Sequence, residues 1–281
     1  MKRSLTEGNL FLAQTFDPRL LLEYEQLLKN TNASAETRLA VYDRYPELLR
    51  ERDDCYLDKM MLLTLRGKYK EAIELAAHKR FHIYEGGEGK LTKLHAWLHV
   101  LYADETAKHG DVAQAEEICR KGAEMPKSYG EAKTFFNQEA HIYYLLGTLY
   151  GKDGDPEKER AAYEKAAEYK AAVSEISLFR ALALKKLNRT EEAQTVLEEM
   201  LQTAQNLLDN EDRRTYYGVG SPSPMPFETD IVKQNRLAGY TLKAFALYGT
   251  ENYSEAEDCI RRAEKIDPNH PEACFYHRIL K

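Results

Sequence analysis

The sequence predicts an all-α protein built from stacked helical hairpins, and three observations support this. Apolar residues recur at i, i+3 and i+4 spacing almost from end to end, and the alternation typical of strands is nearly absent. Short turns with Gly or Asn interrupt the pattern, as in LRGKY, KHGDV, GKDGDP, KLNRT and YGTENY. The segments around these turns are similar to one another, which indicates an internal repeat.

Each repeat unit consists of an apolar helix, a turn, and a second helix that opens with an acidic turn and a small residue. We place the units at 53–80, 96–125, 140–170, 174–208 and 237–270 of one domain that spans 1–281. Residues 1–50 contain one further hairpin that lacks the small residues. We expect this hairpin to cap the array, because a stack of repeats needs an end unit with a polar face.

Small residues recur where two helices of a unit must approach closely. They are Gly147, Ala181 and Ala244 in first helices, and Ala72, Ala115, Ala193 and Ala256 in second helices. In this pattern the units resemble tetratricopeptide repeats, although Glu159 stands where the third unit should have a small residue. The resemblance implies a right-handed superhelical solenoid whose first helices line a concave groove.

Three junctions between units are longer than the period of roughly 34 residues requires. These insertions occupy 81–95, 126–139 and 209–236. Junctions of a stacked array lie on one edge, so we expect the insertions to share a face. Because they are rich in aromatic residues, which disordered linkers usually lack, we expect ordered loops that fold over the rim of the groove.

Composition narrows the function classes. The formal charge is −6 and basic residues are scattered, so we expect no nucleic-acid partner. We find no apolar stretch long enough to cross a bilayer and no leader, and therefore expect a soluble, cytoplasmic protein without a membrane partner. The cysteines form no CxxC pair, so we expect buried thiols rather than a zinc site or disulfides: Cys55, Cys119, Cys259 and Cys274.

The glycine-rich stretch EGGEGK at 85–90 resembles a phosphate-binding loop only superficially. A P-loop requires Gly where Tyr84 stands and Ser or Thr where Leu91 stands, and a strand before it. A backbone anion nest ahead of the next helix stays open, although Glu85 and Glu88 beside it disfavour an anion.

Two further patterns point weakly to chemistry. Glu85 and Glu88 could act as an acid and base of the glycosidase type, but nothing in the sequence supplies a pocket for them. His95 and His99 share a helix face, but Ala96 stands where a zincin needs Glu, and a third ligand is missing. We therefore predict a protein that is not an enzyme and binds no cofactor or metal.

The resemblance places four candidate partner-binding residues near the groove: Trp97, Asp104, His141 and Tyr144. Trp97 and Tyr144 have an alternative interpretation as packing residues. The insertions add a set that we call the rim residues: His82, Tyr84, Glu85, Glu88, Tyr216, Tyr217 and Phe227. The basic and Asn residues that chaperone-binding members use to clamp a peptide carboxylate are not matched.

The leading hypothesis is a scaffold that binds a protein or peptide through the groove and rim. The alternative is a carbohydrate-binding or carbohydrate-processing accessory protein, since aromatic rings with polar edges suit sugars. In EGGEGK, PKSYGEAK and YYGVGSPSPMPFE the chain also resembles the C-terminal helical region of large bacterial proteins. In that family an N-terminal β-rich domain of unknown function precedes the repeats, often near carbohydrate-utilisation genes.

Overall fold

The computed structural model describes residue 15 and residues 17–82, 87–130, 139–211 and 230–280. Within these ranges all regular structure is helical and no strand occurs. Five helical hairpins follow one another: α5 (Asp53–Leu65) with α6 (Tyr69–Ala77), α7 (Lys90–Lys108) with α8 (Val112–Gly122), α9 (Ala140–Lys152) with α10 (Pro156–Glu168), α11 (Ser177–Lys186) with α12 (Thr190–Asp209), and α13 (Ile231–Gly249) with α14 (Tyr253–Ile266).

Close approach of the two helices in a hairpin depends on the small residues. A Cβ atom added at Gly147 of α9 would lie only 2.5 Å from the ring of Tyr163 of α10. In the other hairpins, Ala72, Ala115, Ala193 and Ala256 of the second helices are fully buried. The small-residue pattern in the sequence therefore reflects interhelical contact, because a larger side chain would force the helices apart.

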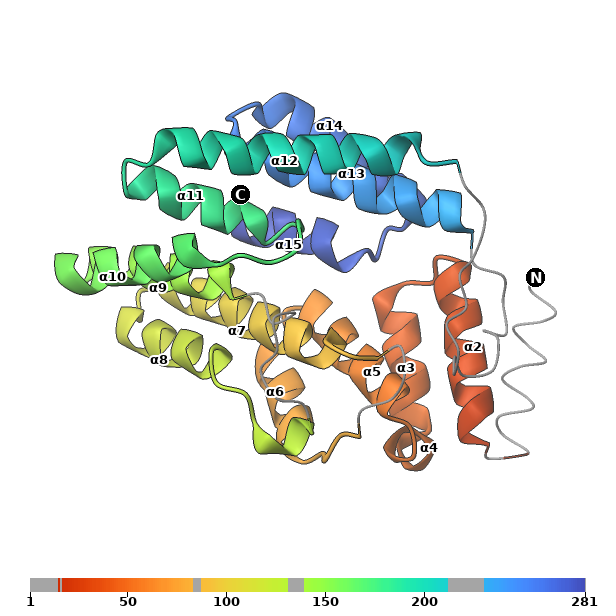
Figure 1. The fold of residues 1–281 in the computed structure, drawn as a ribbon. Helices are drawn as coiled ribbons and strands as arrows, with labels where there is room; N and C mark the ends of the chain where they lie inside the picture. Colours follow the sequence, from red (N-terminus) through yellow and green to blue (C-terminus); the bar gives the residue numbers. More distant parts are fainter. Residues whose placement is uncertain (1–14, 16, 83–86, 131–138, 212–229, 281) are drawn as a thin grey trace.

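The first helices of the hairpins form one layer. α7 contacts α5 and α9, and α11 contacts α9 and α13, whereas each second helix packs on the first helix of its own hairpin and of the next. Figure 1 shows this succession from the orange α5 and yellow α7 to the blue α13. The protein is thus an all-α helical-repeat structure, as the sequence predicts.

Several element boundaries differ from those expected. α7 begins at Lys90, so its first turn lies inside the insertion placed at 81–95. The second insertion contains a short 3-10 helix, η1 (Lys127–Tyr129), and the third separates Asp209 from Ile231.

The N-terminal segment has three described helices instead of one hairpin: α2 (Pro18–Asn30), α3 (Ala35–Arg44) and α4 (Pro46–Arg50). Pro46 separates the last two, since Pro lacks an N–H and disfavours helical backbone in the residue before it.

A buried charge network joins this N-terminal segment to the first hairpin. The Arg38 guanidinium donates to Glu25, and its Nη2 donates to both carboxylate oxygens of Asp58 on α5, at 3.0 and 3.1 Å. The Tyr42 hydroxyl also donates to Asp58, at 3.1 Å. Burial and the nearby Asp58 raise the pKa of Glu25 to about 7, although Arg38 opposes the shift. The network therefore fixes α2 and α3 onto α5.

The last helix, α15 (Pro271–Ile279), lies outside the repeats that the sequence predicts. It turns back after α14 and contacts α5 and α7 as well as α13 and α14. Figure 1 shows it between the upper helices α11 and α13 and the lower helix α7. A single short helix thus touches both the first and the last hairpin.

Candidate partner-binding face

We call the surface that contacts α15 the inner face. It comprises residues that bond or stack with this helix: Leu65, Tyr69, Lys93, Trp97, Phe245 and Tyr248. Most of them lie on first helices, which the sequence places along the groove. The inner face is therefore the counterpart of the predicted groove, and α15 covers it.

An aromatic cluster forms the centre of this contact. Trp97 of α7 stacks on Phe275 of α15, with ring centroids 4.9 Å apart and planes at 29°. The Trp97 ring also contacts two other rings: its centroid lies 4.6 Å from that of His141 on α9 and 5.7 Å from that of Phe179 on α11. Trp97 and His141 have no exposed area. In this conformation Trp97 is therefore a packing residue, and neither Trp97 nor His141 lines an open groove.

Three polar atoms in this cluster have no hydrogen-bond partner within the described part of the chain. They are the indole Nε1 of Trp97 and both ring nitrogens of His141. Burial, with a further contribution from the positive charge of Lys93, lowers the pKa of His141 to about 3. The His141 ring is therefore neutral at pH 7, with one donor and one acceptor unused.

An ion triad closes the first turn of α15. The Lys93 ammonium lies 2.7 Å from Glu272 of α15 and 2.8 Å from Glu175, which precedes α11. Burial opposes the charged form of Lys93, but the two carboxylates outweigh it and raise its pKa. Burial likewise opposes ionisation of Glu272, yet Lys93 prevails and lowers the Glu272 pKa to about 2. The Lys93 side chain is 42% exposed, so solvent can compete for this contact.

In the last turn of α15, the guanidinium of Arg278 binds at the turn between α5 and α6. Arg278 donates to the carbonyl of Leu65 at 2.6 Å and to the hydroxyl of Tyr69 at 2.7 Å. Between them, Gly67 has a φ of 72°, and a Cβ atom there would lie 3.2 Å from Arg278 Nη1. Because Leu65 ends α5, its carbonyl also carries the negative end of a helix dipole. The α5–α6 turn is thus shaped to receive a cation.

The other two groove candidates lie beside this contact. Asp104 is half-buried and pairs at 2.8 Å with Lys108, whose ammonium donates to the Arg278 carbonyl at 3.0 Å. Tyr144 is also half-buried, with its ring 5.8 Å from that of Phe179. Burial, followed by the neighbouring Tyr163, raises the pKa of Tyr144 to about 12. Both side chains keep some exposed area at the edge of the inner face.

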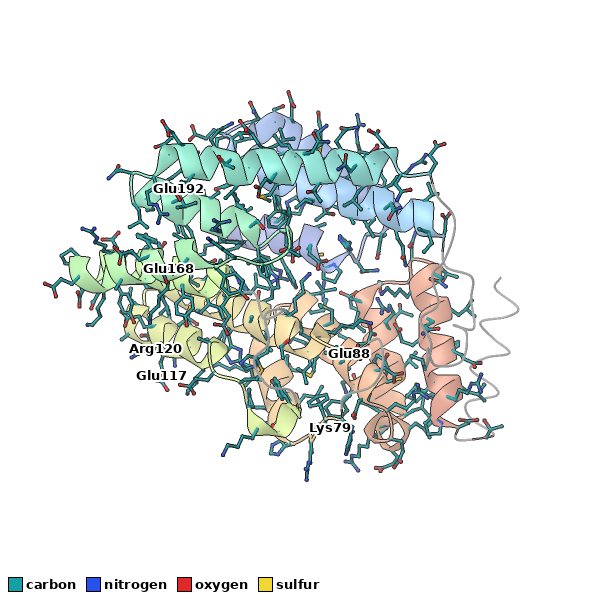
Figure 2. The ribbon with its side chains drawn as sticks, viewed as in Figure 1. Lys79, Glu88, Glu117, Arg120, Glu168 and Glu192 are labelled. Atoms are coloured by element: carbon teal, nitrogen blue, oxygen red, sulfur yellow. The ribbon has the colours of Figure 1, made fainter. Side chains whose placement is uncertain are left out.

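Only two of the rim residues lie within the described ranges. The His82 side chain is 80% exposed, and its backbone N–H donates to Asp53 Oδ2 at 2.7 Å. Glu88 is exposed just before α7 (Figure 2). Tyr84, Glu85, Tyr216, Tyr217 and Phe227 lie outside the described residues. The carbohydrate hypothesis rests mainly on these five residues.

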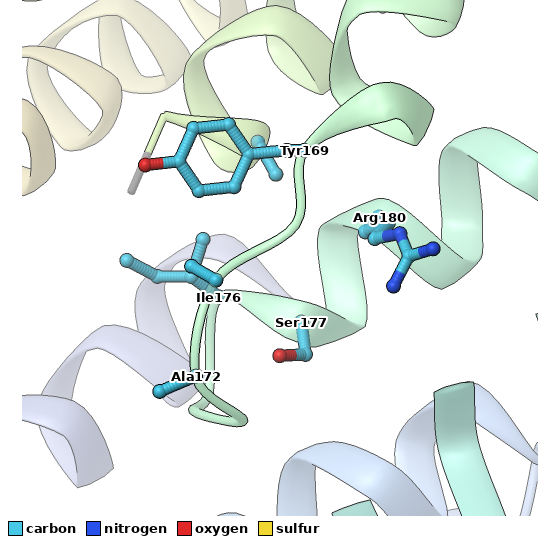
Figure 3. Close-up of a pocket in the computed structure, with 7 residues that line it drawn as sticks. Tyr169, Ala172, Ile176, Ser177 and Arg180 are labelled. Carbon is cyan, nitrogen blue, oxygen red and sulfur yellow. The ribbon is translucent and has the colours of Figure 1, made fainter. Parts of the chain in front are cut away.

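One small hollow lies before and along α11, between Tyr169 and Arg180 (Figure 3). Its volume of about 10 Å³ is room for roughly one water molecule. Its lining residues come from the start of α9, the segment between α10 and α11, and the first turn of α11: Ala140, Tyr169, Ala171, Ala172, Ile176, Ser177 and Arg180. A sugar does not fit this hollow.

The histidine pair and the cysteines have packing roles. The His95 ring nitrogens lie 3.0 Å from the Tyr129 hydroxyl and 3.2 Å from a backbone carbonyl, and His99 Nδ1 lies 2.8 Å from the His95 carbonyl. Among the described residues, no three His, Cys, Asp or Glu side chains are grouped to hold a metal.

None of the helices in those ranges is long and apolar enough to span a bilayer. Of the four cysteines expected to be buried thiols, Cys55, Cys119 and Cys259 are buried and Cys274 is half-buried.

Comparison with known proteins identifies the repeats. Residues 140–172 and 237–270 match the family model of the tetratricopeptide repeat. The chain thus carries tetratricopeptide repeats at α9–α10 and α13–α14, which confirms the sequence prediction for these two units. The crystal structure of BtubC (BKLC) from P. vanneervenii is similar over 94% of this chain and 87% of that chain, with 17% identity and a TM-score of 0.32. A similarity that weak supports no functional conclusion.

Sequence reasoning missed α15, although a local signal exists. Pro271 favours a helix start after the turn at Asp267–His270, and Ala273, Tyr276 and Ile279 repeat at three-residue spacing. These features predict a helix, but they do not predict that it covers the inner face.

Proposed function

We propose that this protein is a non-enzymatic scaffold that binds a protein or peptide partner through the inner face and the rim residues. The observation that supports the proposal most directly is the pair of tetratricopeptide repeats within a stack of helical hairpins. Stacked repeats present an extended surface made of side chains from several units, which suits an elongated polypeptide.

The charge of the chain indicates which charge such a partner should carry. Glu88 is exposed just before α7, Asp104 near the other end of α7 is paired with Lys108, and the whole chain carries a formal charge of −6. Because exposed charges act mainly on association rate and specificity, a partner with basic residues should associate faster at low salt.

Quantitative affinity capture tests this function. The tagged full chain is compared with a variant that lacks 212–229 and with Tyr253→Ser, a control at an exposed residue of α14 that is 55% exposed. We expect the wild type and the control to retain the same partners and the loop deletion to lose at least one of them. An identical partner list for all three chains would disprove the contribution of the rim. The absence of any reproducible partner would disprove the scaffold function.

A further inference from the structure

The contact between α15 and the inner face has the anatomy of a receptor with a bound helix. The helix is short, follows a four-residue turn, and reaches from the last hairpin to the first. Its attachments combine two buried aromatic rings, Phe275 and Tyr276, with charged contacts at each end through Glu272 and Arg278. An aromatic anchor at the centre and polar contacts around it are the usual composition of a protein-binding site.

The fit is incomplete at the centre, which points to another occupant. Among the described residues, Trp97 Nε1 beside Phe275 and both ring nitrogens of His141, whose ring contacts Trp97, are buried without a hydrogen-bond partner. Buried polar groups almost always have partners, and each unmet group costs free energy. A helix that brings a hydrogen-bonding side chain to these atoms would gain an interaction that α15 does not make.

The polar contacts at the two ends define the chemistry of that helix. Lys93 requires a carboxylate in the first turn, and the Leu65, Gly67 and Tyr69 site requires a guanidinium about two turns later. In α15 these positions are 272, 275 and 278, an i, i+3, i+6 stripe on one helix face. An arginine suits the carbonyl and hydroxyl at this site better than a lysine, because its planar fork makes two bonds at once.

We propose that the inner face is a binding site for an amphipathic helix of a partner protein, and that α15 occupies this site in its absence. The partner helix carries an acidic residue, an aromatic residue and an arginine at i, i+3 and i+6, with a polar side chain that reaches Trp97 and His141. This inference rests on the proposed scaffold function and specifies its binding mode. Six of the nine α15 residues are only half-buried, and the Lys93 side chain is 42% exposed, so solvent can reach the contact and a competing helix can displace α15.

The test uses the full chain and a fluorescein-labelled peptide with the sequence of 268–281, in which Cys274 is replaced by Ser. Arg278→Ala removes the contacts with Leu65 and Tyr69, and Glu272→Gln weakens the contact with Lys93. Arg261→Ala on α14, whose side chain is 58% exposed, is the matched control. Hydrogen exchange of residues 271–279 and acrylamide quenching of Trp97, the single Trp, report whether α15 is loosened.

We expect faster exchange and stronger quenching in Arg278→Ala and Glu272→Gln, and peptide binding roughly tenfold tighter or more than to the wild type and to Arg261→Ala. A peptide with Phe275→Ala should bind the Arg278→Ala chain roughly tenfold more weakly or worse. If neither substitution loosens α15, this helix is a permanent part of the core and the inference is wrong. It is also wrong if the loosened chains do not gain peptide binding, or if both peptides bind equally.

Further outcomes distinguish a partner helix from a second copy of this chain, and failure of the helix-binding mode from failure of the scaffold function. If Arg278→Ala becomes dimeric by light scattering without peptide, the natural second occupant is α15 of another copy, which contradicts a partner protein in this role. Peptide binding without any captured partner would refute the scaffold function alone. Captured partners together with no peptide binding would refute only the helix-binding mode.

Discussion

Replacing Phe275 by Ala tests whether α15 is held by its aromatic anchor. The Phe275 side chain is 1% exposed and stacks on Trp97 at 4.9 Å. Truncating a buried Phe typically costs about 3 to 5 kcal/mol, from lost burial and from the cavity left behind. Because α15 is a terminal helix that can leave its site, the cost cannot exceed the free energy of docking. We therefore expect about 3 kcal/mol, the lower end of that range.

Trp97 makes this substitution measurable without any label. It is the single Trp of the chain and has no exposed area, so loss of the Phe275 ring admits water beside the indole. We expect a red shift of emission, stronger acrylamide quenching, and a lower midpoint of urea unfolding. Tyr253→Ala on the exposed surface of α14 is the control, with an expected effect within roughly 0.5 kcal/mol.

The double substitution Phe275→Ala with Tyr276→Ala distinguishes undocking from local repacking. If the first change already releases α15, the second adds almost nothing, because Tyr276 has left its contact with Phe245 as well. Unchanged emission together with a loss of less than about 1 kcal/mol would refute the aromatic anchor.

Three other changes test the packing within a hairpin, the buried charge network and the protonation of His141. Gly147→Ala should destabilise the fold by about 1 to 3 kcal/mol because its Cβ meets the Tyr163 ring at 2.5 Å, and Tyr163→Ala should abolish that penalty in urea unfolding. Arg38→Met strands two carboxylates and should cost about 3 to 5 kcal/mol in the same assay, partly recovered by adding Glu25→Gln. His141 has a folded pKa of about 3, so the unfolded chain binds its proton first and stability falls as pH drops from about 6.5 toward 3. His141→Phe should remove about 2 kcal/mol of the loss between pH 6.5 and 5, measured by unfolding at each pH, and an unchanged pH slope would contradict a neutral buried ring.

Sequence reasoning identifies the hairpins because their signals are local. Apolar spacing, turn residues and small residues such as Gly147 and Ala256 lie within one unit, and each unit packs mainly on its neighbours. These features predict the helices and the repeat correctly. They place the bounds of the insertions less well, since α7 already begins at Lys90, inside the insertion placed at 81–95.

The environment of the groove candidates depends on contacts that local patterns do not encode. Trp97 and His141 occupy positions that would face a groove in an open array, and only the return of α15 buries them. That return is fixed by pairs far apart in the chain, such as Arg278 with Leu65. A periodic pattern predicts which face of a helix is apolar. It does not predict which of the many surfaces of a repeat array that face packs against.

The return of α15 also changes how the repeats cooperate. In an open array each unit contacts only its neighbours, so terminal units can unfold separately. Here the turn before α15 reaches the opposite end, where Asn269 donates to the carbonyl of Ala33 at 3.0 Å. Arg278 adds a second link to the first hairpin. Occupation of the inner face therefore ties the two ends of the stack together, and any partner helix that displaces α15 must either replace these links or release the ends from each other.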